Sequence, residues 1–166
     1  MNDLILLLTA SFVYYHSSKE EKLQSIGDTP CSLLFETDSR FYTTFTESGD
    51  RLHFGEYGRK GARYGVICGM LTEQLNYEES FYLLTNYIND LRQPFGIAHH
   101  LGVVDVPQRQ TSFIELHDYW QDDEGVDWEV KGYTNGRYVS VLYVKNITAV
   151  PSDRQAAFLN SFSFGA

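Results

Sequence analysis

Apolar and polar residues alternate along residues 111–145, which read TSFIELHDYWQDDEGVDWEVKGYTNGRYVSVLYVK. Alternation with a period of two is typical of β-strands that bury one face. Asn135-Gly136 interrupts the pattern with the residue pair most typical of a two-residue hairpin turn of type I′. Gln121–Gly125 is a polar loop that ends in glycine, which suits a longer hairpin connection. We therefore predict three antiparallel strands joined by these two turns.

The two turns fix the register of the predicted strands. The two-residue turn places Trp128 opposite Tyr143. A longer loop that closes Trp120 onto Val126 places Asp118 opposite Trp128. One face of this meander then collects apolar residues and is the predicted core side: Ile114, Leu116, Trp120, Val126, Trp128, Val130, Val139, Val141 and Tyr143. Asp118 is the one acidic residue on that side.

The other face of the predicted meander is polar and aromatic. We expect it to form, with the Gln121–Gly125 hairpin tip, the surface that contacts a protein partner. The candidate binding residues are Glu115, His117, Tyr119, Asp127, Glu129, Lys131, Tyr133 and Tyr138. The register sets His117 beside Glu129 and also pairs a glutamate with Lys131; such pairs contribute about 0.2–1 kcal/mol each. The same residues also fit an ordinary half-solvated sheet face with weak ion pairs.

Further elements are predicted on both sides of the meander. Strands are expected at 4–15, 40–46, 51–57, 62–71 and 103–106, with a loop or helical turn at 19–22 and turns at 27–30, 47–50 and 58–61. Gly65 and Gly69 inside the strand expected at 62–71 suggest a bulge or the close approach of another backbone.

Between Asn76 and Pro94 the apolar period changes from two to 3.6, which predicts a helix. Asn76 caps it, Glu79 completes a capping box, and Pro94 ends it. The face expected to pack on the sheet carries Tyr77, Phe81, Leu84, Ile88 and Leu91. A short helix is predicted to open at Pro151-Ser152-Asp153 and to carry Phe158 and Leu159. Together these elements predict a single α+β domain over residues 1–166, with an antiparallel sheet of two meanders packed by one long helix and a short C-terminal helix.

The composition narrows the classes of partner. The chain has a net charge of −9 and lacks the basic stripe that neutralises phosphates, so a nucleic-acid role is disfavoured and basic or protein partners are favoured. Two cysteines, Cys31 and Cys68, are compatible with one bridge or with two free thiols, and Cys68 in an apolar strand fits an inert buried thiol. The apolar run near the N-terminus follows Asp3 rather than Lys or Arg and is too short to span a bilayer. We therefore predict no transmembrane segment and favour a cytoplasmic protein over an exported one.

The sequence offers few patterns with catalytic or metal-binding chemistry. His99-His100 with Glu115, His117 and Asp118 form a weak metal-ligand set, because adjacent histidines on an extended chain point to opposite faces. The glycine-rich stretch 55–61 lacks the rest of a phosphate-binding loop and fits a hairpin turn. We predict no metal and no cofactor.

The alternative to a module that binds a protein partner is a small hydrolase-like enzyme, or a ligand-binding protein, that uses Asp118, His117 and Glu129 in a cleft. A buried, unpaired Asp118 would have a raised pKa and act as a general acid. A carboxylate bonded to a backbone N–H is the commoner arrangement.

The end of the chain resembles a known family. The strand Arg137–Val144, the break at Pro151 and the helix running into FLNSFSF at Phe158–Phe164 are similar to the C-terminal signature of PsbP/Mog1-like (DcrB-like) bacterial proteins. The order of meander, long helix, strand, meander and helix is similar too, so the resemblance covers the last two-thirds of the chain. It implies an α/β/α sandwich and a non-catalytic module, such as a photosystem accessory protein, a GTPase-binding factor or a secretion-effector chaperone.

Overall fold

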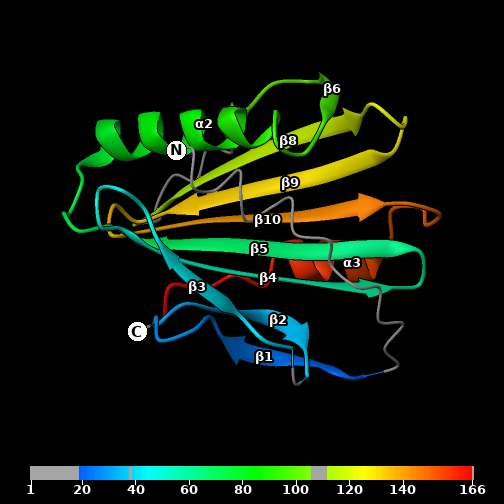
Figure 1. Ribbon diagram of the computed structural model, residues 1–166, viewed down its shortest axis with the longest axis horizontal. Helices are drawn as coiled ribbons and strands as arrows, with labels where there is room; N and C mark the ends of the chain where they lie inside the picture. Colours follow the sequence, from blue (N-terminus) through cyan, green and yellow to red (C-terminus); the bar gives the residue numbers. More distant parts are fainter. Residues whose placement is uncertain (1–18, 38, 106–111, 166) are drawn as a thin grey trace.

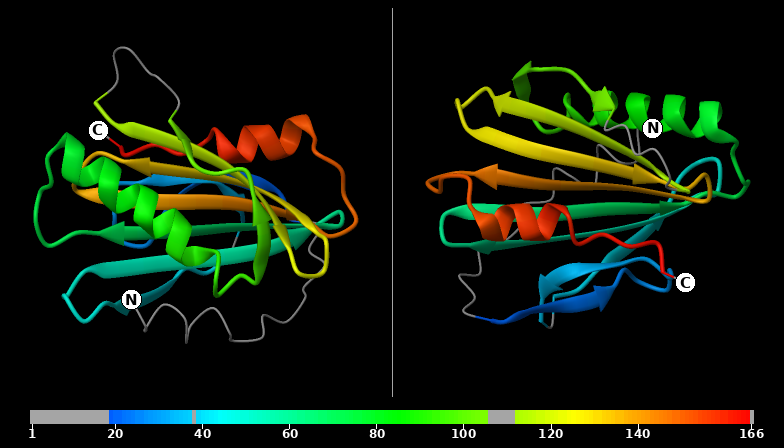
Figure 2. Two further views of the ribbon diagram at one scale, coloured as in Figure 1. Left: turned by 90° about the horizontal axis from the view of Figure 1, so that it is seen from above. Right: turned by 180° about the vertical axis from the view of Figure 1, so that it is seen from behind.

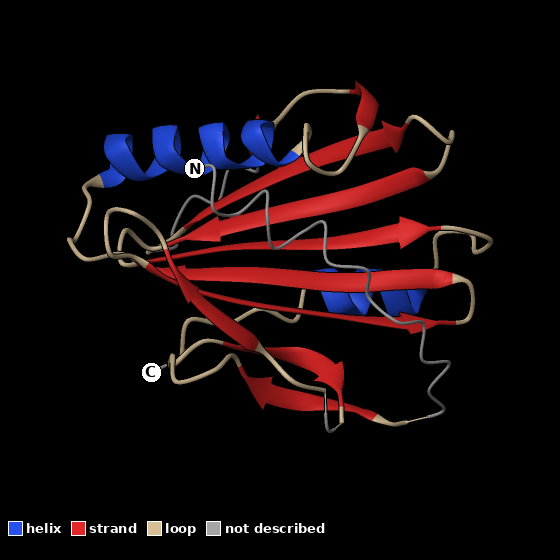
Figure 3. Cartoon of the chain, viewed as in Figure 1, coloured by secondary structure: helices blue, strands red, loops and turns tan. Residues whose placement is uncertain are grey.

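The computed structural model describes residues 19–37, 39–105 and 112–165 of the chain. The described strands form an antiparallel sheet of eight strands and a separate two-stranded sheet (Figures 1 and 3). The described helices pack on opposite faces of the large sheet, the longer one over β8 and β9 and the shorter one beside β10 (Figure 2). This arrangement confirms the predicted α+β class.

The elements have the following bounds. They are β1 Glu21–Ser25, β2 Ser32–Glu36, β3 Tyr42–Phe45, β4 Arg51–Arg59, β5 Ala62–Met70, α2 Tyr77–Leu91, β6 Ile97–His100, β7 Val104–Asp105, β8 Ile114–Asp122, β9 Asp127–Thr134, β10 Tyr138–Asn146 and α3 Asp153–Leu159. The large sheet has the order β3-β4-β5-β10-β9-β8-β6, and β7 also pairs with β8. The pair β1–β2 forms the small sheet.

Both predicted meanders are present, whereas the short elements around them differ from the predictions. Residues 19–22 were expected to form a loop or a helical turn. Glu21 and Lys22 instead belong to β1 and pair with β2. β6 was not predicted, and the strand expected at 103–106 is reduced to the two-residue β7. The strand predicted at 4–15 and the last residue of the strand expected at 103–106 lie outside the described residues.

The predicted register of the β9–β10 hairpin is wrong by two residues: Val130 lies opposite Tyr143 rather than Val141. The reason is the Asn135 side chain, whose Oδ1 accepts hydrogen bonds from the backbone N–H groups of Arg137 (3.0 Å) and Tyr138 (2.9 Å). These bonds move the turn onto Gly136-Arg137. Gly136 has φ +84° and the only non-glycine described with positive φ is Lys60, so the turn is not type I′.

The β8–β9 register is also shifted by two residues, so that Trp120 lies opposite Trp128 and Asp118 opposite Val130. The loop closes on Asp122 rather than on Trp120: the N–H of Asp122 donates to the carbonyl of Val126 over 3.0 Å. A shift of two residues leaves each side chain on its predicted face. The division of β8, β9 and β10 into two faces is therefore as predicted.

One hydrophobic core lies between α2 and the sheet. Asn76 and Glu79 form the predicted capping box at the start of α2, with bonds of 3.0 Å in each direction. Leu84, Ile88 and Leu91 are buried against residues of β8, β9 and β10, as predicted. Tyr77 does not belong to this face: it is 64% exposed, and Ser80 is buried instead. The helix is thus rotated toward Ser80 relative to the predicted stripe.

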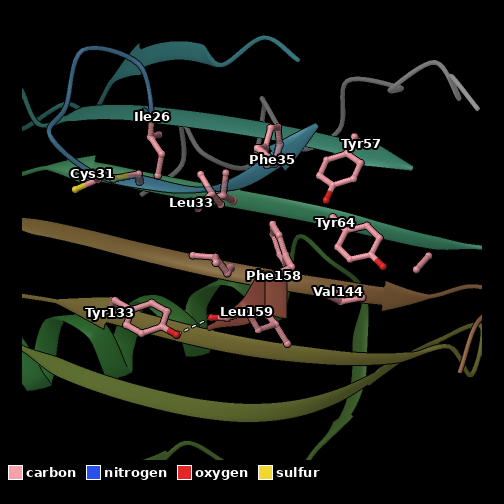
Figure 4. Packing of buried hydrophobic residues seen from close by; sticks show 14 residues of the cluster. Ile26, Cys31, Leu33, Phe35, Tyr57, Tyr64, Tyr133, Val144, Phe158 and Leu159 are labelled. Carbon is pink, nitrogen blue, oxygen red and sulfur yellow. Dashed lines mark hydrogen bonds between the residues drawn. The ribbon is translucent and has the colours of Figure 1, made fainter. Parts of the chain in front are cut away.

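A second core lies on the other face of the sheet, where β1–β2, α3 and the C-terminal segment meet (Figure 4). Leu33 and Phe35 of β2 pack there with Phe158 and Leu159 of α3. The Tyr133 hydroxyl donates to the Leu159 carbonyl over 2.6 Å (Figure 4). The small sheet is joined to the end of the chain by an antiparallel bridge between Ser32 and Ser163. The packing of the short C-terminal helix on the sheet was predicted. The contribution of β1 and β2 to this core was not, because these strands are short and have weak periodicity.

Gly65 in the middle of β5 leaves room for a side chain, not for a backbone or bulge as predicted. The register of β5 with β4 and β10 runs without interruption. A Cβ atom on Gly65 would lie 2.0 Å from Cζ of Tyr143, whose hydroxyl donates to Oε2 of Glu56 over 2.6 Å. The ring is therefore held in place above the glycine.

We expect Gly65→Ala to lower the free energy of unfolding by about 1–3 kcal/mol, because a methyl group there forces the buried Tyr143 ring to move. Gly69→Ala in the same strand is the matched control: its Cβ would meet only the flexible end of Leu52, at 3.0 Å. Urea denaturation of both variants measures the difference. Equal losses in the two variants would contradict this role of Gly65.

Candidate functional site

The sheet face opposite α2 is covered at one end and open at the other. α3 packs against β10 and β2, and the C-terminal aromatics Phe162 and Phe164 pack on Tyr133 and Phe113. Figure 2 (right) shows β8 and β9 extending beyond the part of the sheet on which α3 lies. Tyr119 at that end is 47% exposed and Asp127 is exposed. We call the part of this face that carries His117, Tyr119, Asp127 and Glu129 the open surface.

The eight predicted binding residues lie on this one face but differ in accessibility. Tyr119 and Asp127 are exposed, whereas His117, Glu129, Lys131 and Tyr138 are half-buried. Glu115 and Tyr133 are buried, at 8% and 4% exposure. Tyr133 and Tyr138 contribute to the second core rather than to a surface. The structure therefore leaves the β8–β9 end of the predicted site accessible and uses the other end for packing.

Both predicted charge pairs form on this face. Nε2 of His117 lies 3.1 Å from Oε1 of Glu129, and Nζ of Lys131 donates to Oε1 of Glu115 over 2.7 Å. Because of the shifted register, these are diagonal pairs: His117 lies directly opposite Lys131 in the ladder. Diagonal neighbours are within reach of long side chains. The pairs fix the polar side chains in place while leaving them partly exposed.

Tyr119 lies beside this charge pair. Its ring centroid is 4.7 Å from that of His117, and Glu129 is its directly opposed partner in β9. Partial burial and the negative charge of Glu129 raise the pKa of the Tyr119 hydroxyl. Tyr119 thus stays a neutral phenol, which can both donate and accept a hydrogen bond from its exposed position.

The hairpin tip also has a buried part and an exposed part. Asp122 is 3% exposed and organises the loop: its carboxylate accepts bonds from the N–H of Val126 (2.9 Å) and from Trp128 Nε1 (3.0 Å), and Lys145 Nζ lies 2.8 Å from it. Burial opposes ionisation of Asp122, but the Lys145 contact and the N–H donors outweigh it and lower its pKa. Residues 123–125 are exposed. Of the predicted 121–125 tip, only these three residues are exposed and therefore accessible to a partner.

Asp118 lies on the opposite, α2 side of the sheet and is fully paired. Its carboxylate accepts bonds from Arg92 Nη2 (2.6 Å), Trp120 Nε1 (2.6 Å) and the backbone N–H groups of Gly102 (3.0 Å) and Tyr119 (2.9 Å). The expected bond to a backbone N–H is confirmed. His117 and Glu129 lie on the other face, so the structure does not bring together the three residues of the enzyme alternative.

The remaining candidates take structural positions. His99 and His100 are exposed on β6, and His100 Nε2 lies 3.3 Å from Arg92 Nη1. Among the residues described, no three His, Cys, Asp or Glu side chains are arranged to hold a metal ion. The stretch 55–61 forms the β4–β5 hairpin, as expected. No helix in the described ranges is long and apolar enough to cross a membrane.

Cys31 and Cys68 are both free and buried. A hydrogen bond with Cys31 and burial raise the pKa of the Cys68 thiol well above its ordinary value. A protonated, buried thiol is a poor nucleophile, in line with the inert role predicted for Cys68.

His53 is a buried histidine that sequence reasoning did not single out. It is 2% exposed, its Nε2 lies 3.0 Å from Oδ1 of Asp28, and its Nδ1 lies 2.9 Å from Oγ1 of Thr43. Burial lowers its pKa, although the charge of Asp28 acts against this. The contacts join β4 to β3 and to the β1–β2 turn. The cluster therefore ties the small sheet to the large one.

We expect the free energy of unfolding to decrease as the pH falls below 6.5, the ordinary pKa of histidine, because His53 then takes up a proton in the unfolded chain before it does so in the folded protein. Its contribution is fully present above that pH. Denaturation at a series of pH values measures the slope, which His53→Gln should flatten. The exposed His99→Gln should leave the slope unchanged; an equal slope in wild type and His53→Gln would contradict the assignment.

Comparison with known protein families and with curated proteins finds no match to this chain.

A groove on the α2 side of the sheet was not predicted from the sequence. It has a volume of about 710 Å³ and is lined by α2, the β3–β4 turn and the strands β4, β5 and β10. Five separate segments assemble it, and no local pattern in the sequence indicates such an assembly.

Proposed function

We propose that this protein is a non-catalytic binding module that contacts a protein partner through the open surface and the exposed hairpin tip at 123–125. The observation that carries the proposal is Tyr119, which is 47% exposed on an uncovered sheet face, beside the hydrogen-bonded pair of His117 and Glu129. An exposed aromatic residue bordered by ordered polar groups is the composition of an interface hot spot. Neighbouring pairs hold these side chains, so binding costs little rotamer entropy.

The position of Asp118 favours a binding module over the enzyme alternative. An acid catalyst needs an exchangeable proton and access to substrate. The Asp118 carboxylate is 1% exposed and bound by a guanidinium, an indole N–H and two backbone N–H groups. These contacts give it a structural role at the end of α2.

The resemblance to PsbP/Mog1-like proteins is part of the same proposal. It rests on Phe158–Phe164, where α3 runs into an aromatic segment. That segment packs on an antiparallel sheet, the arrangement that the resemblance implies. Membership of a family of accessory modules would account for a chain whose ordered polar surface lacks an evident reaction centre.

The test is an affinity isolation from the lysate of the source organism, with wild-type protein and the double variant Tyr119→Ala/Asp127→Ala as baits. Both residues are exposed, so the variant is expected to fold normally. A partner retained in stoichiometric amount by wild type should be lost or weakened at least tenfold in the variant, as removal of an aromatic hot spot costs about 2 kcal/mol or more.

The matched control is Tyr77→Ala, which removes an even more exposed tyrosine (64%) from α2 on the other side of the sheet. It should retain the partner. If wild type and Tyr119→Ala/Asp127→Ala retain the same proteins in the same amounts, the open surface is not the binding site.

A further inference from the structure

The groove on the α2 side has the shape of a binding site. Its floor is made by Leu52 of β4, Gly69 of β5 and Val139 of β10, and its wall by Leu83 and Tyr87 of α2. In Figure 1, α2 lies over β8 and β9 rather than over the floor strands β4, β5 and β10. The β3–β4 turn borders these floor strands on the other side. A volume of about 710 Å³ lies within the range of known ligand sites, roughly 300–1,000 Å³.

The floor of the groove is apolar and its rim is acidic. Asp50 of the β3–β4 turn and Glu79 and Asp90 of α2 stand at its rim. None of the lining residues in the described part of the chain is Lys, Arg or His. The Glu79 carboxylate accepts one bond from the N–H of Asn76, and Asp90 is exposed. A groove of this kind is complementary to an apolar group that carries positive charge.

Tyr87 is a second, independent indication. It lines the groove, and its hydroxyl is buried without a hydrogen-bond partner among the described residues. Burial raises the pKa of this hydroxyl, so it remains a neutral donor and acceptor. Buried tyrosine hydroxyls nearly always have a partner. A ligand that reaches Tyr87 can supply the missing one.

We propose that this groove binds an amphipathic segment of a partner protein. The apolar side chains of the segment lie on the floor of the groove, against Leu52 and Val139, and its basic side chains lie against Glu79 and Asp90. Charge selects this occupant. A second copy of the chain would bring its own acidic rim and a net charge of −9 to the same place. A basic segment instead gains from each carboxylate at the rim.

The groove and the open surface are separate sites. Val139 faces α2, whereas His117 and Tyr119 face away from it, so the sheet lies between them. The groove proposal therefore does not depend on the proposed function of the open surface, and either can fail alone.

The test is a calorimetric titration of the full chain with a synthetic helical peptide that has a leucine stripe and lysines on its other faces. A second peptide replaces every lysine by glutamate. We expect saturable binding of one leucine–lysine peptide per chain and no binding of the leucine–glutamate peptide.

Two variants locate the peptide. Glu79→Gln/Asp90→Asn removes two rim charges and keeps the capping box, in which Gln replaces Glu; it should weaken binding about three- to tenfold. Asn86→Trp fills the groove from its wall and should weaken binding at least tenfold. Asp50 is left unchanged because its carboxylate accepts bonds from the Ser48 hydroxyl in the β3–β4 turn and from the backbone N–H of Thr72 after β5.

The matched control is Glu20→Gln/Asp153→Asn, which removes two exposed charges that belong neither to the groove nor to the open surface. It has the same net charge as the rim variant and should bind like wild type. Thermal melting of every variant verifies that it is folded.

Three outcomes would overturn the proposal. Equal weakening in the rim variant and the control variant would show attraction to net charge alone. Unchanged binding to Asn86→Trp would place the peptide elsewhere. Binding of monomeric dodecyltrimethylammonium that Asn86→Trp abolishes, without binding of the peptide, would assign the groove to a small cationic amphiphile.

Discussion

Replacing Asp118 by alanine is expected to lower the free energy of unfolding by about 3–5 kcal/mol, because it leaves the guanidinium of Arg92 without its counter-charge in a largely buried position. The side chains of Arg92 and Asp118 are only 15% and 0% exposed. The change also removes the acceptor of the Trp120 indole N–H and of the Gly102 N–H. Urea denaturation monitored by tryptophan fluorescence measures the loss.

The control is Asp123→Ala, which changes an exposed acidic residue directly after the same strand. It should change the free energy of unfolding by no more than about 0.5 kcal/mol. Arg92→Leu should also lower the free energy of unfolding, since it leaves the buried carboxylate of Asp118 without its counter-charge. Asp118→Ala/Arg92→Leu should lose less than the sum of the two single changes. A loss of less than about 1 kcal/mol in Asp118→Ala would show that the pair does not hold α2 to β8.

Phe158→Ala is expected to cost about 3–5 kcal/mol, the usual effect of deleting a fully buried aromatic side chain. Phe158 is 1% exposed and meets Tyr64 and Tyr57 edge-on, with centroid distances of 5.2 and 6.4 Å. No other part of α3 except Leu159 reaches as deeply into the second core. The loss is measured by the same denaturation experiment.

Phe45→Ala provides the comparison for an exposed phenylalanine, since Phe45 is 58% exposed on β3. It should alter stability by about 0.5 kcal/mol or less. If Phe158→Ala and Phe45→Ala have similar stabilities, the second core does not contribute to folding as the packing implies.

The parts of the fold that sequence reasoning identified are those encoded over short distances. The capping box of Asn76 and Glu79 and the period of Leu84, Ile88 and Leu91 identify α2 locally, and alternation identifies β8, β9 and β10. The faces of these strands were also correct, because side-chain direction depends only on parity. The predicted pairs of His117 with Glu129 and of Glu115 with Lys131 follow from that parity.

The errors arise where one side chain decides between neighbouring registers. Asn135-Gly136 suggested a type I′ turn, but the Asn135 carboxamide bonds the next backbone N–H groups and moves the turn by one residue. Asp122 does the same in the preceding loop. Asx side chains that bond the backbone in this way are common in turns, and the residue types do not reveal which bond forms.

The candidate site was only partly predictable for a different reason. The burial of Glu115 and Tyr133 depends on α3 and the C-terminal segment folding back over one end of the sheet face. The alternation within β8 and β9 contains no information about that cover. For the same reason, the groove between α2 and the β3–β4 turn has no signature in any single segment.

The bridge between Ser32 and Ser163 determines when a newly made chain can finish folding. Synthesis delivers the N-terminal strands first, yet the backbone of Ser32 bonds that of Ser163, and the N–H of Leu34 bonds Oγ of Ser161, 127 residues later. Leu33 and Phe35 must therefore wait for α3 to leave the ribosome before they are covered. A nascent chain that stops short of α3 keeps an apolar strand uncovered, and chaperones recognise such segments.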